Sequence, residues 1–151
     1  MNMEWILTDE KDKRFLSLVD ELDLRYFELI GDELSKYETY NEFSTPHVVG
    51  LAFKESHEVA CASYRVLDEI SVEFKRVYVK KDFRKRGIAF KLISELEKLV
   101  VSDDFKYSYI VTGKHNHAAI RLYEKLDYEI TEKFGQFRDD ERVICMKKKF
   151  E

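Results

Sequence analysis

Residues 72–101 read VEFKRVYVKKDFRKRGIAFKLISELEKLVV, a succession of strand, basic-loop and helix patterns. The apolar residues of the second half recur every three or four positions, which is typical of an amphipathic helix. That apolar face comprises Ile88, Ala89, Leu92, Ile93, Leu96, Leu99 and Val100. Lys91, Glu95 and Lys98 fall on the other face, close enough to form ion pairs. The stretch therefore predicts one strand–loop–helix unit.

The loop of this unit has the features of an anion site. Its sequence, Arg84-Lys85-Arg86-Gly87, places three cationic side chains immediately before the helix. The first N–H groups of a helix have no partner within it, and they add a partial positive charge at the same place. Gly87 has no side chain that would keep a phosphate away from the backbone. We therefore expect residues 84–89 to bind a phosphate group.

Two sequence motifs give the chain a family resemblance. Arg84, Gly87 and Ala89 fit the pattern Arg/Gln-x-x-Gly-x-Gly/Ala. Downstream, residues 112–128 read TGKHNHAAIRLYEKLDY, with a strand end, an asparagine-led helix and a Leu-Tyr-Glu-Lys ending. Together these motifs resemble the GNAT superfamily of acyl-CoA-dependent N-acetyltransferases, and the resemblance extends over residues 47–149. Asp127 stands where the family usually has glycine, and aspartate can adopt the left-handed conformation that such a turn needs.

The length and composition fit one globular domain spanning residues 1–151. Hydrophobic residues make up 44% and aromatic residues 14%, enough for a packed core. We find no apolar run that could span a membrane and no signal peptide, so we expect a cytoplasmic protein without a membrane partner. Cys61 and Cys145 lie in apolar segments and are interpreted as reduced core residues.

A cluster of positive charge allows two interpretations. Residues 75–86 hold seven lysines and arginines and one acid, Asp82. Such clusters occur on nucleic-acid-binding surfaces. However, the formal net charge of the chain is −4, and a compact patch beside a helix N-terminus suits one multiply charged small molecule better. The family resemblance implies that this molecule is acetyl-CoA, acting as a co-substrate, and we expect no nucleic-acid partner.

The remaining patterns predict the other elements of the fold. They indicate strands at residues 5–7, 48–53, 58–66, 107–112, 128–134 and 142–150, and helices at 15–30, capped by Thr8 or Asp9, and 118–126, capped by Asn116. Strands 70–79 and 107–112 should be parallel, because a helix separates them. The resemblance implies an α/β (α+β) GNAT fold. This is a mixed, mostly antiparallel twisted sheet flanked by helices, in which the central parallel strands splay apart to admit the cofactor.

The resemblance also implies catalytic roles for two residues. Glu73 matches an acidic position found in many GNAT enzymes, where a carboxylate can take the proton of the acceptor amine. The alternative for Glu73 is a strand-face salt bridge to Lys75 or Arg142. Tyr123 matches the tyrosine beside the leaving sulfur, where it would donate a hydrogen bond to the thiolate or act as a general acid. The alternative for Tyr123 is aromatic packing in the core.

The implied cofactor site combines backbone and side-chain groups. Backbone N–H groups on the splayed strand would bind the thioester oxygen, and Asn116 would contact the pantetheine amides as well as cap its helix. The full set comprises Val77, Tyr78, Val79, Arg84, Lys85, Arg86, Gly87, Ile88, Ala89 and Asn116.

The sequence constrains the acceptor less closely. Arg65 could hold a substrate carboxylate or be an ordinary surface arginine. We expect a small amine or an amino-acid-like metabolite as the acceptor. A protein lysine or N-terminus and a CoA-binding module without turnover are the alternatives, and a homodimer is left open. His115 and His117 lack further ligands at a suitable spacing, so we expect no metal. Neither cysteine has a base beside it in the sequence, so we expect direct transfer.

Overall fold

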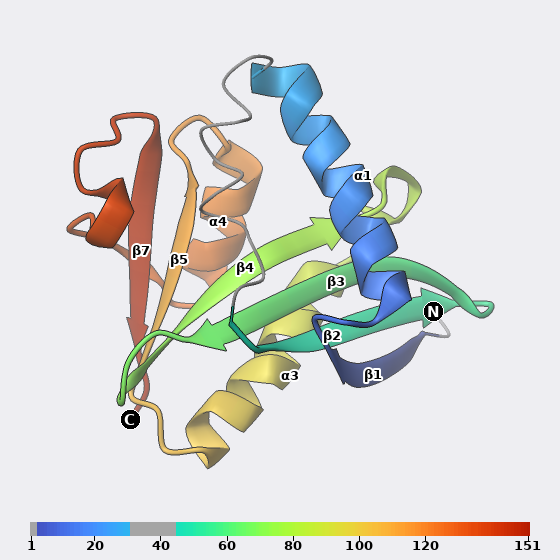
Figure 1. Cartoon of the computed structure of the whole chain (residues 1–151), viewed down its shortest axis with the longest axis horizontal. Coiled ribbons are helices and arrows are strands. Elements are labelled where there is room, and N and C mark those ends of the chain that lie inside the picture. The colour runs from blue at the N-terminus through green and yellow to red at the C-terminus, as the bar shows by residue number, and fades with distance from the viewer. Residues whose placement is uncertain (1–2, 31–44) are drawn as a thin grey trace.

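The structure is a computed structural model that describes residues 3–30 and 45–151. Its main elements, in chain order, are β1 Glu4–Asp9, α1 Lys13–Ile30, β2 His47–Lys54, β3 His57–Val66, β4 Ser71–Val79, α3 Ile88–Ser102, β5 Tyr107–Gly113, α4 His117–Lys125, β6 Glu129–Thr131 and β7 Val143–Lys149. Two short 3-10 turns, Lys81–Phe83 and Gly135–Phe137, complete this part of the chain. Figure 1 shows α1 on one face of the sheet and α3 and α4 on the other. None of the helices in the described part is both long and apolar enough to cross a membrane.

Seven strands form one sheet in the order β1-β2-β3-β4-β5-β7-β6. The neighbouring pairs are antiparallel except for β4 and β5, which run parallel as predicted. Their ladder joins Ser71–Phe74 to Tyr107–Ile110, although β4 continues to Val79 and β5 to Gly113. The two strands diverge from a shared start, as Figure 1 shows. The predicted mixed, mostly antiparallel sheet with splayed central strands is confirmed.

A bulge in β4 lies just beyond the end of the parallel ladder. Arg76 has a φ of 57°, and the register with β3 shifts, so that Tyr78 is opposite Cys61 but Lys75 is opposite Ser63. Two β3 side chains bond the carbonyl groups there. Ser63 Oγ donates to the Lys75 carbonyl at 2.6 Å, and Cys61 Sγ donates to the Arg76 carbonyl at 3.3 Å. Because bulges bend a strand and increase its twist, this one helps to turn the end of β4 away from β5.

Helix α3 packs its apolar face on the sheet as predicted. Buried on that face are Ile88, Leu92, Ile93, Leu96 and Val100, with Ala89 and Leu99 half-buried. A Cβ added to Gly50 on β2 would lie 3.3 Å from Leu92 Cδ2, which shows how closely the helix approaches the sheet. The predicted pairs on the outer face are also present. Glu95 accepts hydrogen bonds from Lys91 at 2.7 Å and from Lys98 at 3.1 Å.

The predicted cap of α1 is wrong. Asp12, rather than Thr8 or Asp9, immediately precedes the helix, and its Oδ1 accepts the N–H of Arg14 at 2.8 Å. Its carboxylate also accepts hydrogen bonds from the Arg14 guanidinium and from the Thr8 hydroxyl. The Arg14 guanidinium above all holds the pKa of Asp12 well below its ordinary value. Asp9 instead accepts the N–H of Lys11, in the turn before the helix.

The core face of α1 agrees with the prediction where its side chains are described. Buried in one cluster with β2 and β3 are Phe15, Leu18, Val19, Val49, Leu51, Phe53 and Cys61. The apolar pattern of the predicted helix continues to Tyr26, Leu29 and Ile30, whose side chains lie outside the described residues. Residues 31–44, which follow the helix, lie outside them too.

The C-terminal strands pair antiparallel as predicted, but β6 is shorter than expected. The apolar and aromatic pattern predicts a strand over 128–134, whereas the strand ends at Thr131. Phe134 and Phe137 instead pack with Val143 and Cys145 in a small separate cluster. Phe134 and Phe137 therefore lie in a loop and pack against β7 instead of extending β6.

Candidate active site

The loop between β4 and α3 presents backbone groups to solvent, as an anion site requires. Gly87 precedes the first residue of α3 and has a φ of 77°, while Lys85 has a φ of 63°. Lys85, Arg86 and Gly87 are all exposed. A Cβ added to Gly87 would meet nothing within 4 Å. Packing within the protein therefore does not demand glycine here, whereas the left-handed backbone and an approaching ligand both would.

Arg84 has a structural contact in addition to its predicted role. Its Nε donates to the Val79 carbonyl at 2.8 Å, and its guanidinium lies 5.8 Å from the centre of the Tyr78 ring. The guanidinium of Arg86 lies 5.4 Å from the centre of the Phe83 ring. Arg84 thus ties the loop to the end of β4. The phosphate-binding roles of the three cationic side chains stay predictions.

The splayed end of β4 has backbone groups beyond the reach of the parallel ladder. Val77, Tyr78 and Val79 are half-buried, and Tyr78 and Val79 pair with β3 on one edge. On the opposite edge, the described ladder with β5 ends at Phe74. An edge without a ladder partner can bond a ligand instead. This is the place where the sequence predicts the thioester oxygen to bind.

Helix α4 places Tyr123 in the core below the diverging strands. Asn116 caps the helix as predicted, because its Oδ1 accepts the N–H of Ala119 at 3.2 Å. Asp127 has a φ of 71° at the other end, so the expected left-handed turn is present without glycine. Tyr123 is 6% exposed, and its ring centre lies 6.2 Å from that of Tyr128.

Glu73 is a buried carboxylate on β4 with a partner that was not predicted. Arg65 Nε donates to its Oε1 at 3.0 Å, and Arg65 Nη2 lies 2.7 Å from the same oxygen. The expected alternative partners were Lys75 and Arg142. Arg142 pairs with Asp140 at 3.2 Å. The charge of Glu73 does act on Lys75, where it partly opposes the lowering of the Lys75 pKa by burial. Arg65 is therefore held in an ion pair and is not a plain surface residue, while its suggested contact with a substrate carboxylate stays a prediction.

Glu73 and Tyr123 belong to opposite faces of the sheet. Tyr123 lies in the apolar cluster that contains Phe74 and Ile110, on the side of α3 and α4. Because successive strand residues point to opposite faces, Glu73 lies on the other side, where it meets Arg65. Glu73 and the cluster around Tyr123 both lie near the end of the β4–β5 ladder, where the two strands separate.

Comparison with known proteins shows the family. The model of the acetyltransferase (GNAT) family matches residues 15–128. The chain belongs to the GNAT family. An acetyltransferase of Pectobacterium atrosepticum is 45% identical over 51 residues, which are 34% of this chain and 36% of that protein. The match therefore covers about a third of the length of this curated relative.

Solved structures share the fold over nearly the whole GNAT chain. One from Klebsiella pneumoniae, provisionally described as an acyl-CoA N-acyltransferase, has a TM-score of 0.78 and 25% identity, and the match covers 96% of this chain and 97% of that one. The PaiA N-acetyltransferase of Thermoplasma acidophilum, solved in complex with coenzyme A, has a TM-score of 0.77 and 16% identity, with 99% and 100% covered.

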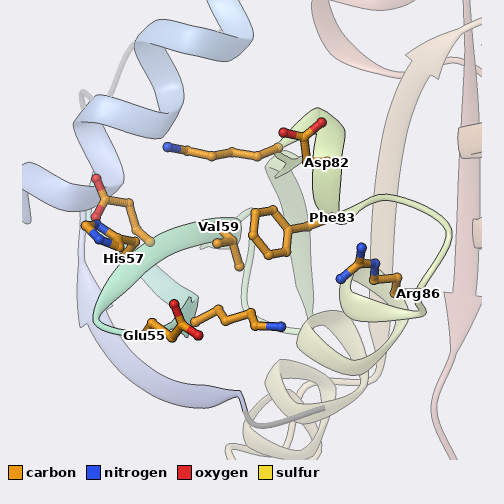
Figure 2. Close-up of a pocket in the computed structure, with 9 residues that line it drawn as sticks. Glu55, His57, Val59, Asp82, Phe83 and Arg86 are labelled. Carbon is orange, nitrogen blue, oxygen red and sulfur yellow. The ribbon is translucent and has the colours of Figure 1, made fainter.

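A cavity of about 470 Å³ lies beside the loop between β4 and α3 of this GNAT protein. Figure 2 shows it between the tip of the β2–β3 hairpin, with His57 and Val59, and the loop, with Phe83 and Arg86. Neither Glu73 nor Tyr123 lines this cavity. We therefore do not assign acetyl transfer to it.

Both cysteines of the GNAT protein are free and buried, as predicted. Burial raises the pKa of Cys61 to about 12 and also raises the pKa of Cys145. Thiolates are therefore disfavoured at both positions. The rings of His115 and His117 have centres 6.5 Å apart, and no three potential metal ligands cluster within residues 3–30 and 45–151.

Reasoning from the sequence missed the buried polar contacts of the protein, and two of them show why. Arg65 and Glu73 stand directly opposite each other across the β3–β4 turn, so counting outward from that turn would have paired them. Glu97 on α3 accepts hydrogen bonds from Tyr128 and from Lys148, both at 2.9 Å. Burial raises the pKa of Glu97. Because its partners lie far away in the sequence, no local pattern signals this second contact.

Proposed function

We propose that this GNAT protein transfers an acetyl group from acetyl-CoA to a primary amine, by direct attack of the amine on the thioester. The observation that carries the proposal is the succession of features along β4. A buried carboxylate stands near the end of the parallel ladder, the Val77–Val79 segment follows beyond the described ladder with β5, and the exposed glycine loop comes last. These features would supply a base, a place for the thioester and an anchor for phosphate. The complex of PaiA with coenzyme A supports this choice of cofactor.

Acetyl-CoA would be held largely by backbone groups. N–H groups at the start of α3, next to Gly87, would bind the pyrophosphate, and Arg84 and Lys85 would add charge. The thioester oxygen would accept hydrogen bonds from the Val77–Val79 backbone, where negative charge develops during attack. Asn116 uses its carbonyl oxygen as the helix cap, so its NH₂ group would meet the pantetheine arm.

Glu73 would remove the proton that keeps the amine from attacking. A lysine-like amine has a pKa of about 10.4, so less than about a thousandth is neutral at pH 7, equivalent to roughly 4–5 kcal/mol. Both contacts from Arg65 go to Oε1, which leaves Oε2 for the amine or for a bridging water. The freed lone pair would form the carbon–nitrogen bond, and the carbon–sulfur bond would then break.

Tyr123 would act on the leaving sulfur from the opposite face. A thiol has a pKa near 8.5 and a tyrosine near 10, so full proton transfer runs uphill by about 2 kcal/mol. A hydrogen bond to the thiolate is therefore the minimum role, and general acid catalysis the larger one. The acceptor would enter on the Glu73 side, while the coenzyme leaves on the Tyr123 side. The raised pKa values of both cysteines support direct transfer over an acetyl-cysteine intermediate.

The proposed acceptor is a small amine or an amino-acid-like metabolite. The test is a screen that follows free CoA released from acetyl-CoA, with separate panels of small amines, amino acids, lysine peptides and free N-termini. The proposal is supported if a small amine causes CoA release and if this release is slower in Glu73→Gln. Release with the peptide panels alone would replace the small acceptor with a protein. Tight binding of acetyl-CoA without release in any panel would point to a binding module.

A further inference from the structure

The ion pair between Arg65 and Glu73 is asymmetric. Both guanidinium contacts, at 3.0 Å from Nε and 2.7 Å from Nη2, go to Oε1 of the carboxylate. The Glu73 side chain is 2% exposed and that of Arg65 is 25% exposed. A two-point contact to one oxygen fixes the rotation of the carboxylate and directs the other oxygen away from the arginine. Oε2 is therefore the oxygen that remains for another partner.

The place of this pair in the sheet gives the asymmetry its significance. Glu73 is opposite Arg65 on one side and Tyr109 on the other, one residue before the parallel ladder ends. The carboxylate thus stands where β4 and β5 begin to separate. An ion pair that merely joined β3 to β4 would serve equally well at any pair of facing positions.

We infer that Arg65 is a positioning residue that supplies the counter-charge of the Glu73 carboxylate and turns Oε2 toward the acceptor amine. The inference rests on the proposed role of Glu73 as the base. A buried carboxylate without a counter-charge favours its protonated form, which cannot accept a proton. Among the described residues, the other titratable groups facing Glu73 are Lys75 on β4, Tyr109 on β5 and Cys145 on β7. All three are left unchanged in the test.

The test compares Arg65→Gln and Arg65→Lys with a matched control. The control is Arg142→Gln, which breaks the ion pair between Arg142 and Asp140. The Arg142 side chain is 30% exposed and that of Asp140 is 3% exposed, close to the values for Arg65 and Glu73. We expect Arg65→Gln to lower kcat/KM about 10-fold or more at pH 7 and to move the acidic limb of the pH profile upward, as for loss of a charged hydrogen bond. Arg65→Lys should restore part of the rate, because it keeps the charge without the two-point contact.

Affinity for acetyl-CoA, measured by calorimetry, should stay within about twofold of wild type in every variant, because the pair does not reach the phosphate loop. In a Glu73→Gln background, Arg65→Gln should have little further effect on the rate. If the pH profile of kcat/KM in Arg65→Gln runs parallel to that of wild type, and only the melting temperature is lower, the positioning role is overturned. Additive losses in the double variant would overturn it too.

A second measurement does not depend on turnover. In protein labelled with ¹³C at the glutamate side-chain carboxyl, the Glu73 signal is the one that Glu73→Gln removes. Its titration should move to higher pH in Arg65→Gln and stay in place in Arg142→Gln. An unchanged titration in Arg65→Gln refutes the inference. A wild-type protein that releases no CoA but shows the shift would refute the proposed reaction while leaving the Arg65–Glu73 coupling established.

Discussion

Replacing Gly87 by alanine adds one methyl group, whose effect on stability can be measured separately from its effect on acetyl-CoA binding. The residue has a φ of 77°, and an L-side chain in this left-handed region costs about 1–2 kcal/mol. The added Cβ would meet nothing within 4 Å, so no clash adds to that strain. We expect Gly87→Ala to fold, with a melting temperature lower by about 2–8 °C for a chain of this size.

The effect on ligand binding should be larger and separable. The new methyl group projects into open space at the start of α3, where the pyrophosphate is proposed to lie. Loss of one charged hydrogen bond weakens binding by about 1.5–3 kcal/mol, which is about 10- to 150-fold in Kd. Gly87→Val, with a larger side chain, should abolish binding. Calorimetry with acetyl-CoA measures both.

Gly135 provides the matched control. It also has a positive φ, of 53°, is exposed, and would have nothing within 4 Å of an added Cβ. Gly135→Ala should therefore lose similar stability while its affinity for acetyl-CoA stays at the wild-type value. If Gly87→Ala binds acetyl-CoA as tightly as Gly135→Ala does, residues 84–89 do not form the phosphate site.

Three further substitutions and one labelling experiment test the site and the fold. Tyr123→Phe should lower kcat about 10- to 1000-fold with little change in acetyl-CoA affinity, and wild-type kinetics would remove the tyrosine from the mechanism. Leu92→Asp puts a carboxylate at a position 2% exposed and should unfold the domain, so a circular-dichroism melt with an unchanged midpoint would contradict the packing. Asp12→Ala should cost about 1 kcal/mol at pH 7 in urea unfolding. Because the pKa of Asp12 is lowered from 3.8, the Asp12 contribution is full above that pH, and the difference from wild type should shrink as the pH falls below it. Cys61, with its pKa near 12, should resist a thiol reagent at pH 8 until the protein unfolds, and rapid labelling would show that β3 opens locally.

Local periodicity was enough to predict much of the fold. The apolar spacing from Ile88 to Val100 belongs to a single helix, so the pattern and the packing face are visible together in the sequence. The parallel pairing of β4 and β5 follows from the helix between them. The cap of α1 was not predictable in this way. Residues 8–12 offer three side chains able to cap a helix, and the choice of Asp12 depends on where the helix begins against the sheet.

The sequence indicated the phosphate loop and the cap of α4 because each is formed by neighbouring residues. The bulge in β4 left no such signal, since Arg76 adopts a positive φ without glycine. The partner of Glu73 depended on the register between β3 and β4, which places Arg65 opposite it. The Arg65–Glu73 and Glu97 contacts join residues that are distant in the sequence, and both were missed, whereas the Asn116 cap joins chain neighbours and was found.

The bulge explains how one strand can carry the proposed base, the proposed thioester site and the start of the proposed phosphate loop in succession. Through Phe74, β4 is paired on both edges, so the position of Glu73 is fixed by two neighbouring strands. Beyond Phe74, β4 separates from β5 but stays paired with β3. It must therefore bend without breaking its ladder with β3. An extra residue achieves this, but it displaces carbonyl groups from their regular partners. Ser63 and Cys61 bond those carbonyls from β3, which gives the buried thiol a structural purpose. The bend then sends the following residues toward Gly87, so that the geometry of the proposed base and that of the proposed phosphate loop depend on the same irregularity.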